Sequence, residues 1–337
     1  MLLAGTSAVA ADAAPAKAVG KYFALEGSGS HLLFAAKRTA KAFTEDDAWR
    51  AREYVLNAKG ERTAVPAGYD AYLVGDEPLF RKETKAVDGL TAVHWIRPER
   101  GTSGVLTVPE ASTLVGAAPN GWVIETPIDT GTAGQAYRLR RVSTDGSTTD
   151  LGVPIPDGRP FSVQATPRGL LVVSASSDGD PASDGTIQFM RWSAPGSYHR
   201  IYPGAGVAPQ VGQVFGCGNS SSTLVRCSIG MDEDTRIRLI PLDGTRSIRS
   251  EERCAGLYPA VRTFAVAWTD GTSGHGCAAG RIEQRTKAGR LTVSSRRYSA
   301  LQQPVSAFGR LVVATSTQRQ LVTIADPRST PKRIVGH

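Results

Sequence analysis

Hydrophobic and polar residues alternate along most of this chain in short runs, and tight turns separate the runs. One unit, in which an alternating run enters a turn and a second short run leaves it, occurs seven times. Glycine stands in six of the seven turns, where it supplies the positive φ that a tight hairpin turn requires. The seven copies are Arg52–Gly60, Ala92–Gly101, Ala136–Gly146, Thr186–Gly196, Arg236–Gly244, Arg281–Gly289 and Gln320–Arg328. The pattern predicts a chain built from repeated β-hairpins.

A second hairpin precedes each of these units and has the same period. Its turn leads into a strongly apolar run, most clearly where Asn120 and Gly121 precede Trp122. These apolar runs begin near residues 31, 79, 122, 170, 223, 264 and 311. The six turn glycines are spaced 41 to 50 residues apart. Two hairpins in each period make four strands, which is typical of a propeller blade.

We therefore predict an all-β fold, a seven-bladed β-propeller of four-stranded antiparallel blades. A pair of β-sandwiches also uses evenly spaced strands, but it does not need one two-turn unit repeated seven times. Six blades with an N-terminal extension is the other alternative, because the first two repeats are the least regular. Since each blade buries its faces against its neighbours, we expect residues 18–337 to form a single domain.

The first 17 residues do not fit the repeat. They are small and apolar, and Ala8-Val9-Ala10 matches the cleavage pattern of a secretory signal, although the usual basic segment before it is missing. No other stretch has the run of about 18 apolar residues that a transmembrane helix requires. We expect residues 1–17 to be a leader and the protein to be secreted or otherwise extracytoplasmic.

The four cysteines, Cys217, Cys227, Cys254 and Cys277, all fall in the fifth and sixth repeats. Cys217 and Cys227 flank one predicted hairpin, so they are expected on adjacent strands, while Cys254 and Cys277 fall in loops at one rim. We predict disulfides between Cys217 and Cys227 and between Cys254 and Cys277, which suit an oxidising compartment. A zinc site is the alternative, with His275 nearby, but the chain has no C-x-x-C pair.

The chain carries 39 Lys and Arg against 31 Asp and Glu, a net charge of +8. A basic chain can indicate nucleic acid or another anionic polymer as a partner. Here the arginines alternate along predicted strands, as in Arg138, Arg140, Arg141, Arg236 and Arg238, which favours solvated outer faces. Clustered aromatic residues for base stacking are missing. We expect no nucleic-acid partner, and an anionic cell-envelope polymer suits an exported protein better.

Known catalytic motifs are missing from the sequence. It contains no G-x-S-x-G, no H-E-x-x-H and no P-loop. Ser273, His275 and Asp270 could be drawn as a triad, but close neighbours in sequence rarely form one. His31 and His94 lie at the start of an apolar run or within one, where core or rim packing is expected. These observations favour a protein without enzymatic activity.

Acidic residues gather in the predicted loops between the second and third strands of the repeats. In a propeller these loops open on one face, where ligands usually bind. They contain Glu45, Asp46 and Asp47; Asp88; Asp129; Asp178, Asp180 and Asp184; Asp232, Glu233 and Asp234; and Asp270, with His275 beside it. We expect a ligand-binding face formed by Asp129, Asp178, Asp180, Asp232, Glu233, Asp234, Asp270 and His275.

One of these loops resembles a calcium-binding loop. Asp178, Asp180 and Asp184 are punctuated by glycines, and hard cations prefer several oxygen ligands from such a turn. The bidentate Glu that ends an EF-hand loop is missing. The alternative is an ordinary exposed turn, because such turns are rich in Asp and Gly. A structural calcium ion at these three residues is the one cofactor that the sequence suggests.

Two hairpins resemble the repeats of TolB-type bacterial propellers, a WD40-like family. The matching stretches are Ala118–Ile124 (APNGWVI) and Thr166–Val172 (TPRGLLV), and Tyr137–Leu151 is similar to the next strand and its D-G turn. Neither hairpin keeps the Asp of the family's S-P-D-G motif. The resemblance covers the third, fourth and seventh repeats well. It implies a propeller fold and a role as an interaction platform, and it transfers no catalytic residue.

Two functional hypotheses follow from the sequence. The first is an exported, non-enzymatic propeller, a monomer, that binds a protein or a cell-envelope polymer through its acidic loop face. The alternative is a secreted propeller enzyme, a glycan-processing hydrolase or lyase, with carboxylates around the central funnel. Glycoside hydrolysis needs only two suitably separated carboxylates, and sequence spacing cannot show their separation.

Overall fold

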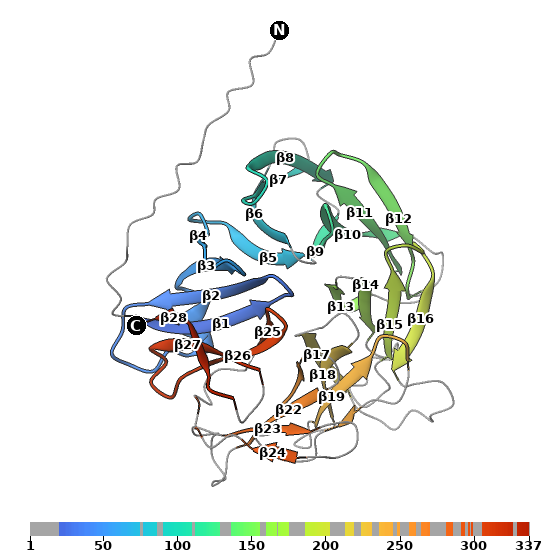
Figure 1. Cartoon of the computed structure of the whole chain (residues 1–337). Coiled ribbons are helices and arrows are strands. Elements are labelled where there is room, and N and C mark those ends of the chain that lie inside the picture. Colours follow the sequence, from blue (N-terminus) through green and yellow to red (C-terminus); the bar gives the residue numbers. More distant parts are fainter. Residues whose placement is uncertain are drawn as a thin grey trace.

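The computed structural model describes residues 20–74, 77–85, 90–109, 112–128, 136–155, 160–166, 168–174, 186–202, 213–218, 224–230, 236–244, 248–249, 256–260, 264–269, 281–285, 291–293, 296, 298, 305–325 and 329–336. These residues form seven antiparallel sheets of four strands, each sheet made of four consecutive strands. The sheets stand side by side around a ring (Figure 1). The prediction of a seven-bladed β-propeller is confirmed.

The blades are numbered in chain order. Blade 1 holds β1 (Lys21–Gly27), β2 (His31–Lys37), β3 (Arg52–Asn57) and β4 (Arg62–Ala64), and one short helix, α1 (Glu45–Ala48), lies between β2 and β3. Blade 2 holds β5 (Asp70–Val74), β6 (Glu77–Lys85), β7 (Leu90–Arg97) and β8 (Thr102–Pro109). Blade 3 holds β9 (Thr113–Ala118), β10 (Gly121–Ile128), β11 (Ala136–Ser143) and β12 (Thr148–Gly152).

The remaining four blades follow the same plan. Blade 4 holds β13 (Pro160–Ala165), β14 (Gly169–Ser174), β15 (Thr186–Arg191) and β16 (Tyr198–Tyr202). Blade 5 holds β17 (Gln213–Gly218), β18 (Leu224–Gly230), β19 (Arg236–Pro241) and β20 (Ile248–Arg249). Blade 6 holds β21 (Gly256–Ala260), β22 (Phe264–Thr269), β23 (Arg281–Arg285) and β24 (Leu291–Val293). Blade 7 holds β25 (Val305–Ala307), β26 (Arg310–Ala314), β27 (Gln320–Ile324) and β28 (Lys332–Gly336).

The N-terminal strands form a complete first blade, so the alternative of six blades with an extension is wrong, as is the pair of sandwiches. The first strand of each blade lies nearest the centre and the fourth at the periphery (Figure 1). The turn glycines also behave as predicted. Five of the six have φ between 60° and 87°, namely Gly60, Gly101, Gly146, Gly196 and Gly244, while Gly289 lies outside the described residues.

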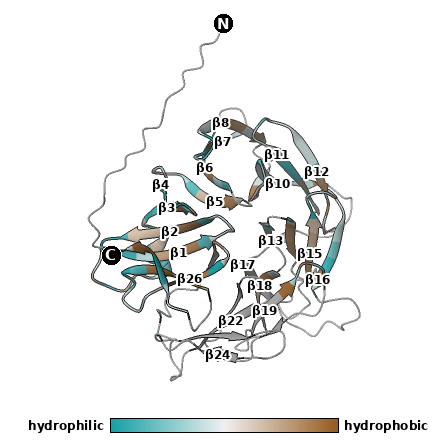
Figure 2. Ribbon diagram, viewed as in Figure 1, coloured by the Kyte–Doolittle hydropathy of each residue, from teal (hydrophilic) through white to brown (hydrophobic). Residues whose placement is uncertain are grey.

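Each sheet is packed between two neighbours, so both of its faces carry apolar residues. In β10, Trp122 and Ile124 pack with blade 2, whereas Val123 between them packs with blade 4. β14 is buried along its whole length. Polar residues concentrate toward the periphery, as the hydrophilic colour of β16 shows in Figure 2. The alternating pattern of the sequence is thus the pattern of blade-to-blade packing.

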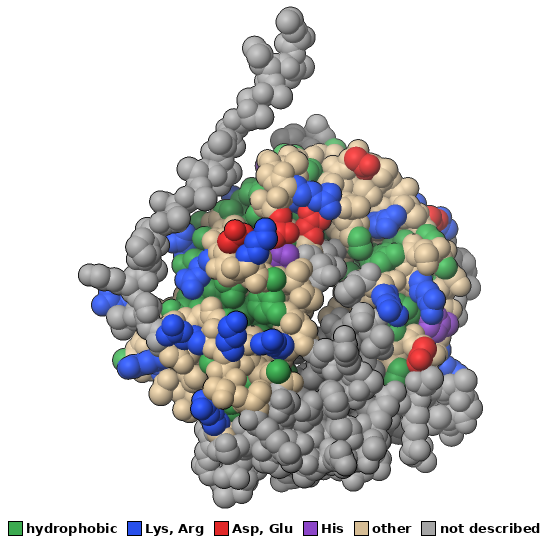
Figure 3. All heavy atoms as spheres, viewed as in Figure 1, with side chains coloured by type: hydrophobic (Ala, Val, Ile, Leu, Met, Phe, Trp, Pro, Cys, Tyr) green, Lys and Arg blue, Asp and Glu red, His purple; other side chains and the backbone are tan. Residues whose placement is uncertain are grey.

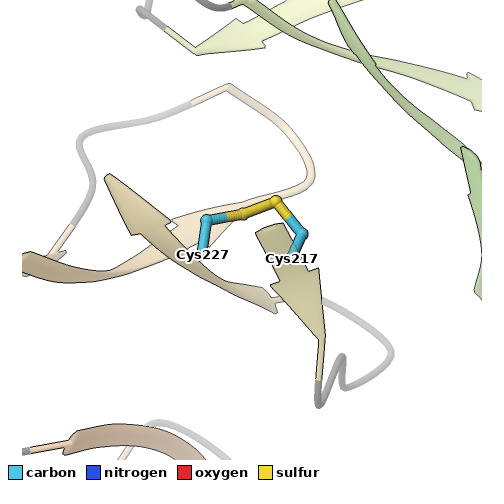
Figure 4. The surroundings of a disulfide bond; sticks show 2 residues. All are labelled: Cys217 and Cys227. Carbon is cyan, nitrogen blue, oxygen red and sulfur yellow. A yellow bond between two sulfur atoms is a disulfide. The ribbon is translucent and has the colours of Figure 1, made fainter. Parts of the chain in front are cut away.

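Blade 5 contains one of the two predicted disulfides. Cys217 on β17 lies directly opposite Cys227 on β18, and the two are bonded (Figure 4). The prediction for this pair is confirmed. Cys254 and Cys277 lie outside the described residues, and their pairing stays a prediction.

Two further observations concern the described part of the chain. It contains no helix of the length and hydrophobicity that crossing a membrane requires. In the same ranges, no three His, Cys, Asp or Glu side chains are grouped so that they could hold a metal ion. The residues of the predicted calcium loop, Asp178, Asp180 and Asp184, and the predicted leader, residues 1–17, both lie outside those ranges.

Candidate functional site

The predicted ligand-binding face is the end of the ring at which the second strand of each blade connects to the third; we call it the loop face, and the opposite end the turn face. Most of the predicted acidic residues fall in these connections. They are the segments between β10 and β11 (129–135), β14 and β15 (175–185), β18 and β19 (231–235), and β22 and β23 (270–280). Asp129, Asp178, Asp180, Asp184, Asp232, Glu233, Asp234, Asp270 and His275, as well as Asp88, lie outside the described residues. Their grouping at one site stays a prediction.

Blade 1 carries the described part of this face, the segment 38–51 between β2 and β3. Its centre is α1, whose N-terminus is closed by a capping box. The Asp47 N–H donates to Thr44 Oγ1 at 3.3 Å, and the Thr44 N–H donates to Asp47 Oδ2 at 3.3 Å. Such a reciprocal pair satisfies two N–H groups that a helix start leaves free. The sequence T-x-x-D therefore fixes this turn locally.

Two buried side chains attach the segment to the ring. Phe43 and Ala48 are fully buried, and they pack against Phe23 of β1 and Ala35 of β2. Gln318 of blade 7 holds the Phe43 backbone on both sides: the Phe43 N–H donates to Gln318 Oε1 at 2.7 Å, and Gln318 Nε2 donates to the Phe43 carbonyl at 2.6 Å. The loop is thus fixed to blades 1 and 7 by apolar contacts and by paired hydrogen bonds.

Most of the other side chains of the anchored segment are exposed to solvent. Asp47 is engaged by Lys37, whose Nζ lies 2.6 Å from Asp47 Oδ1, and this hydrogen bond lowers the pKa of the Asp47 carboxyl. Glu45 and Asp46 are exposed. Trp49, which follows the helix, is 69% exposed, the largest value among the large hydrophobic residues described as exposed. A tryptophan held in water on a fixed backbone is a typical anchor for a partner.

A second group of ionisable residues lies where the inner strands of blades 1 and 2 meet. Glu26 of β1 sits beside Leu73 of β5, and burial raises the pKa of its carboxyl to about 7, while a hydrogen bond from the Leu73 N–H partly offsets the rise. Burial also raises the pKa of Tyr72 and of Glu53. Glu26 is thus a carboxylic acid that can hold or release a proton near neutral pH.

The turn face of the same boundary holds a histidine contact. His31 is buried, its Nε2 lies 2.6 Å from Glu99 Oε1 of blade 2, and its Nδ1 lies 3.0 Å from Ser30 Oγ. The three residues form a hydrogen-bonded chain. Ser30 directly precedes His31 in the sequence, whereas Glu99 belongs to the next blade, so the chain is a contact that joins blades 1 and 2. The predicted packing role of His31 is confirmed. His94, hydrogen-bonded to Thr84 at 3.2 Å, is partly buried within blade 2.

The arginines of blade 3 are more buried than their alternation suggested. Arg138, Arg140 and Arg141 are all partly buried, Arg138 lies 3.3 Å from Asp150, and the Arg141 guanidinium lies 5.9 Å from the Trp192 ring centre. The three side chains are partly exposed, that of Arg138 to 40%, so this outer face is solvated in part, as long arginine stems also cover neighbouring surface. Lys and Arg side chains are spread over the described blades in Figure 3 rather than gathered in one stripe.

Sequence reasoning did not identify Trp49, Glu26 or Gln318. The capping-box spacing from Thr44 to Asp47 was the available signal for α1, and it would have marked Trp49 as the residue after a short helix. Glu26 and Gln318 gave no signal, because their contacts join segments from different blades.

No protein-family model matches the chain, and no curated protein sequence does. Solved structures share its fold. One comes from a structural and mechanistic analysis of two prolyl endopeptidases (TM-score 0.53, 11% identity, 90% of this chain and 47% of that one). Another is a puromycin-hydrolyzing peptidase of Mycobacterium tuberculosis (0.51, 12%, 94% and 53%). A third is an uncharacterized protein of Listeria monocytogenes EGD-e (0.50, 9%, 90% and 91%).

At these identities the likeness concerns the fold alone. The chain spans about half the length of the two peptidase chains that it matches. The fold-level part of the family resemblance is confirmed, because the chain is a β-propeller. The TolB-type assignment stays a prediction, since no family model matches.

Proposed function

We propose that this protein is an exported propeller that binds a macromolecular partner on its loop face and catalyses no reaction itself. The observation that carries the proposal is Trp49, 69% exposed on a segment that Phe43 and Gln318 fix to the ring. An aromatic side chain on a rigid backbone loses little entropy when a partner covers it. The TolB-type resemblance of two hairpins supports the same role as an interaction platform.

The charges of the loop face indicate the chemistry of the partner. Glu45 and Asp46 are exposed near Trp49, but so are four basic residues, Arg38, Lys41, Arg50 and Arg52. A negative rim on this face would therefore come from the predicted acidic residues of blades 3 to 6. Such a rim attracts a protein surface rich in Lys and Arg and repels an anionic polymer. An anionic envelope polymer would instead be drawn to the basic remainder of a chain whose net charge is +8. A basic protein surface is therefore the partner that we favour at the loop face.

Export is supported by two features. Ala8-Val9-Ala10 matches a secretory cleavage pattern, and the bond between Cys217 and Cys227 suits an oxidising compartment. Export is tested by fusing the chain to a reporter that is active only outside the cytoplasm. An inactive reporter would contradict export, and it would leave the proposal for the binding face untouched.

Binding is tested by capture of solubilised envelope proteins and by co-sedimentation with purified cell-wall material. Three proteins are compared: the wild type, Trp49→Ala, and a variant that combines Asp178→Ala, Asp180→Ala, Asp232→Ala and Asp234→Ala. We expect each variant to lower capture of a specific protein at least about tenfold, the size expected for an interface anchor. The captured protein should be basic, and its binding should weaken with salt.

Glu61→Gln is the matched control, since Glu61 is exposed at the β3–β4 turn of the same blade but on the opposite face. It should bind as the wild type does. Equal capture by all variants would contradict the assignment of the loop face. Loss of capture with Glu61→Gln alone would move the site to the turn face.

The enzymatic alternative rests on one described residue. Glu26 has a pKa of about 7, which is the property that a general acid near neutral pH requires. If the protein processes glycans, release of reducing ends or unsaturated sugars from polysaccharide should fall at least about a hundredfold in Glu26→Gln. Unchanged activity in that variant would remove Glu26 from the alternative.

A further inference from the structure

Among the strands that the structure describes, the fourth strand of each blade leaves one edge of its sheet unpaired, and these seven outer edges differ. An unpaired edge is a template for another strand, so proteins protect it by shortness, by charge or by a bulge. Three outer strands, β4, β20 and β24, have at most three residues. Three others, β12, β16 and β28, each contain a charged residue, and their pairing with the third strand is interrupted by a register shift.

β8 has none of these protections, and only Pro109, its last residue, is of another kind that protects an edge. It is eight residues long, TSGVLTVP, and contains no charged residue. It pairs with β7 without any register shift, from Arg97 opposite Thr102 to Leu90 opposite Pro109. Within the described ranges β8 is hydrogen-bonded to β7 alone. Every second residue of such a strand directs its N–H and C=O away from the sheet.

The side chains of β8 divide between two environments. Leu106 and Val108 are buried against blade 3 in a cluster with Trp122. Ser103, Val105 and Thr107 point to the other face and are exposed, Val105 to 57%. This exposed row consists of one β-branched apolar residue between two hydroxyl residues. These are side chains that favour cross-strand pairing.

We propose that β8 pairs in antiparallel orientation with β8 of a second copy of this chain. A twofold axis at Val105 sets Val105 of one protomer beside Val105 of the other and sets Ser103 opposite Thr107 on both sides. Every cross-strand pair in this register is neutral, and Ser103 with Thr107 is a hydroxyl pair of a favourable kind, so two identical strands meet without like charges facing each other. The two second blades then form one eight-stranded sheet.

The composition of the edge selects a second copy over a foreign strand. An edge that recognises a different protein gains its specificity from charges or pockets that match that partner. The exposed row of β8 consists of two hydroxyl side chains, one valine and backbone groups. An identical strand can pair with each of them. The interface is small, so the dimer forms reversibly and its population depends on concentration. This proposal is independent of the loop face and of its partner.

Sedimentation equilibrium of the oxidised full chain tests the proposal, at about 0.15 M salt and from about 1 μM to about 1 mM protein. The wild type should pass from monomer to dimer within this range. Val105→Lys sets two ammonium groups beside each other at the axis and should weaken the dimer at least about tenfold. Thr148→Lys, an exposed position on the outer strand β12, is the matched control and should associate as the wild type does.

Hydrogen exchange locates the contact and separates it from other modes of association. Amide protection in Thr102–Pro109 should rise with concentration in the wild type and in Thr148→Lys, but not in Val105→Lys. A wild type that stays monomeric over the whole range would overturn the proposal. So would a dimer that Val105→Lys leaves intact, or one whose protection rises elsewhere in the ring and not in β8. Circular dichroism shows that each variant is folded.

Discussion

The two boundaries of blade 1 are held by different chemistry. At the closing boundary, blade 1 meets blade 7, and Phe34 is buried with Val312 and Leu321 in one apolar cluster. At the blade 1–2 boundary, the apolar cluster around Phe80 is accompanied by ionisable groups, among them Glu26. Both boundaries are continuous parts of one ring.

The closing boundary shows how the ring is completed without a shared strand. Many ring folds could close by exchanging a strand between first and last blade, but here every sheet is made of four consecutive strands. Closure depends on the apolar cluster and on neutral hydrogen bonds, such as the Tyr22 N–H to the Gln318 carbonyl at 2.9 Å and the Phe308 N–H to the Ser28 carbonyl at 2.9 Å. None of these groups titrates near neutral pH.

The blade 1–2 boundary adds a group that changes charge near neutral pH, next to a polar contact between two side chains. Glu26 there has a pKa of about 7, and the carboxylate of Glu99 lies 2.6 Å from His31. The comparison therefore predicts that the closing boundary contributes most to stability at any pH. The blade 1–2 boundary should contribute most to the pH dependence.

The largest effect is expected at the closing boundary. Phe34 is fully buried and stacks on Tyr54 with ring centres 5.5 Å apart. Phe34→Ala removes a ring from a closed apolar cluster and should lower the free energy of unfolding by about 3–5 kcal/mol. Urea unfolding at pH 5 and at pH 8 measures it, and the loss should be the same at both. Leu90→Ala, at a position 39% exposed, is the control and should change stability by less than about 0.5 kcal/mol.

A small loss in Phe34→Ala, below about 1 kcal/mol, would show that the ring is closed by its hydrogen bonds and not by the cluster. A loss that differs between the two pH values would place a titrating group at the closing boundary. Either result would show that the two boundaries of blade 1 do not differ in the way described.

The second prediction concerns Glu26. Its pKa is raised from the ordinary value of 4.5 to about 7 in the folded protein, so between these pH values the folded state holds a proton that the unfolded chain has lost. Stability therefore falls as pH rises from about 4.5 to about 7 and does not change further above it. Glu26→Gln removes this contribution. The variant should gain about 2–3 kcal/mol relative to the wild type between pH 5 and pH 8.

Unfolding free energies of both proteins across pH 4 to pH 8 measure this difference. Glu61→Gln, at an exposed position of the same blade, should give a curve parallel to that of the wild type. If the Glu26→Gln curve were also parallel, the pH dependence would have another source and the blade 1–2 boundary would lose its distinct role.

Local signals explain why the fold could be read from the sequence. Gly60, Gly101 and Gly146 occupy turns with positive φ. Alternating runs on both sides of such a turn are compatible with few structures other than a β-hairpin. A period that recurs seven times also makes the weak copies identifiable, because the less regular turns of blades 1 and 2 fall at the positions that the period predicts. The disulfide between Cys217 and Cys227 was equally local, since both residues flank one hairpin.

The contacts that distinguish the two boundaries could not be read in this way. Gln318 meets Phe43 across 275 positions, and Glu99 meets His31 across 68. Alternation shows that both faces of a strand are buried, but it does not say which side chain lies opposite across a blade boundary. Trp49 is different, because the local T-x-x-D pattern at Thr44 would have indicated the helix before it, although the prediction did not use that signal.

The smallest effect is expected from the hydrogen-bonded contact between His31 and Glu99 at the blade 1–2 boundary. The side chain of Glu99 is 42% exposed, although its partner His31 is buried, so water competes for the Glu99 carboxyl. Glu99→Gln keeps a hydrogen-bond acceptor for His31 and should lower the free energy of unfolding by less than about 1 kcal/mol. Urea unfolding at pH 7, with Glu61→Gln alongside, measures the loss. A loss above about 2 kcal/mol would mean that this contact, and not the apolar cluster around Phe80, holds blade 2 to blade 1. The strength of the boundary would then depend on this polar contact, and its response to pH on Glu26.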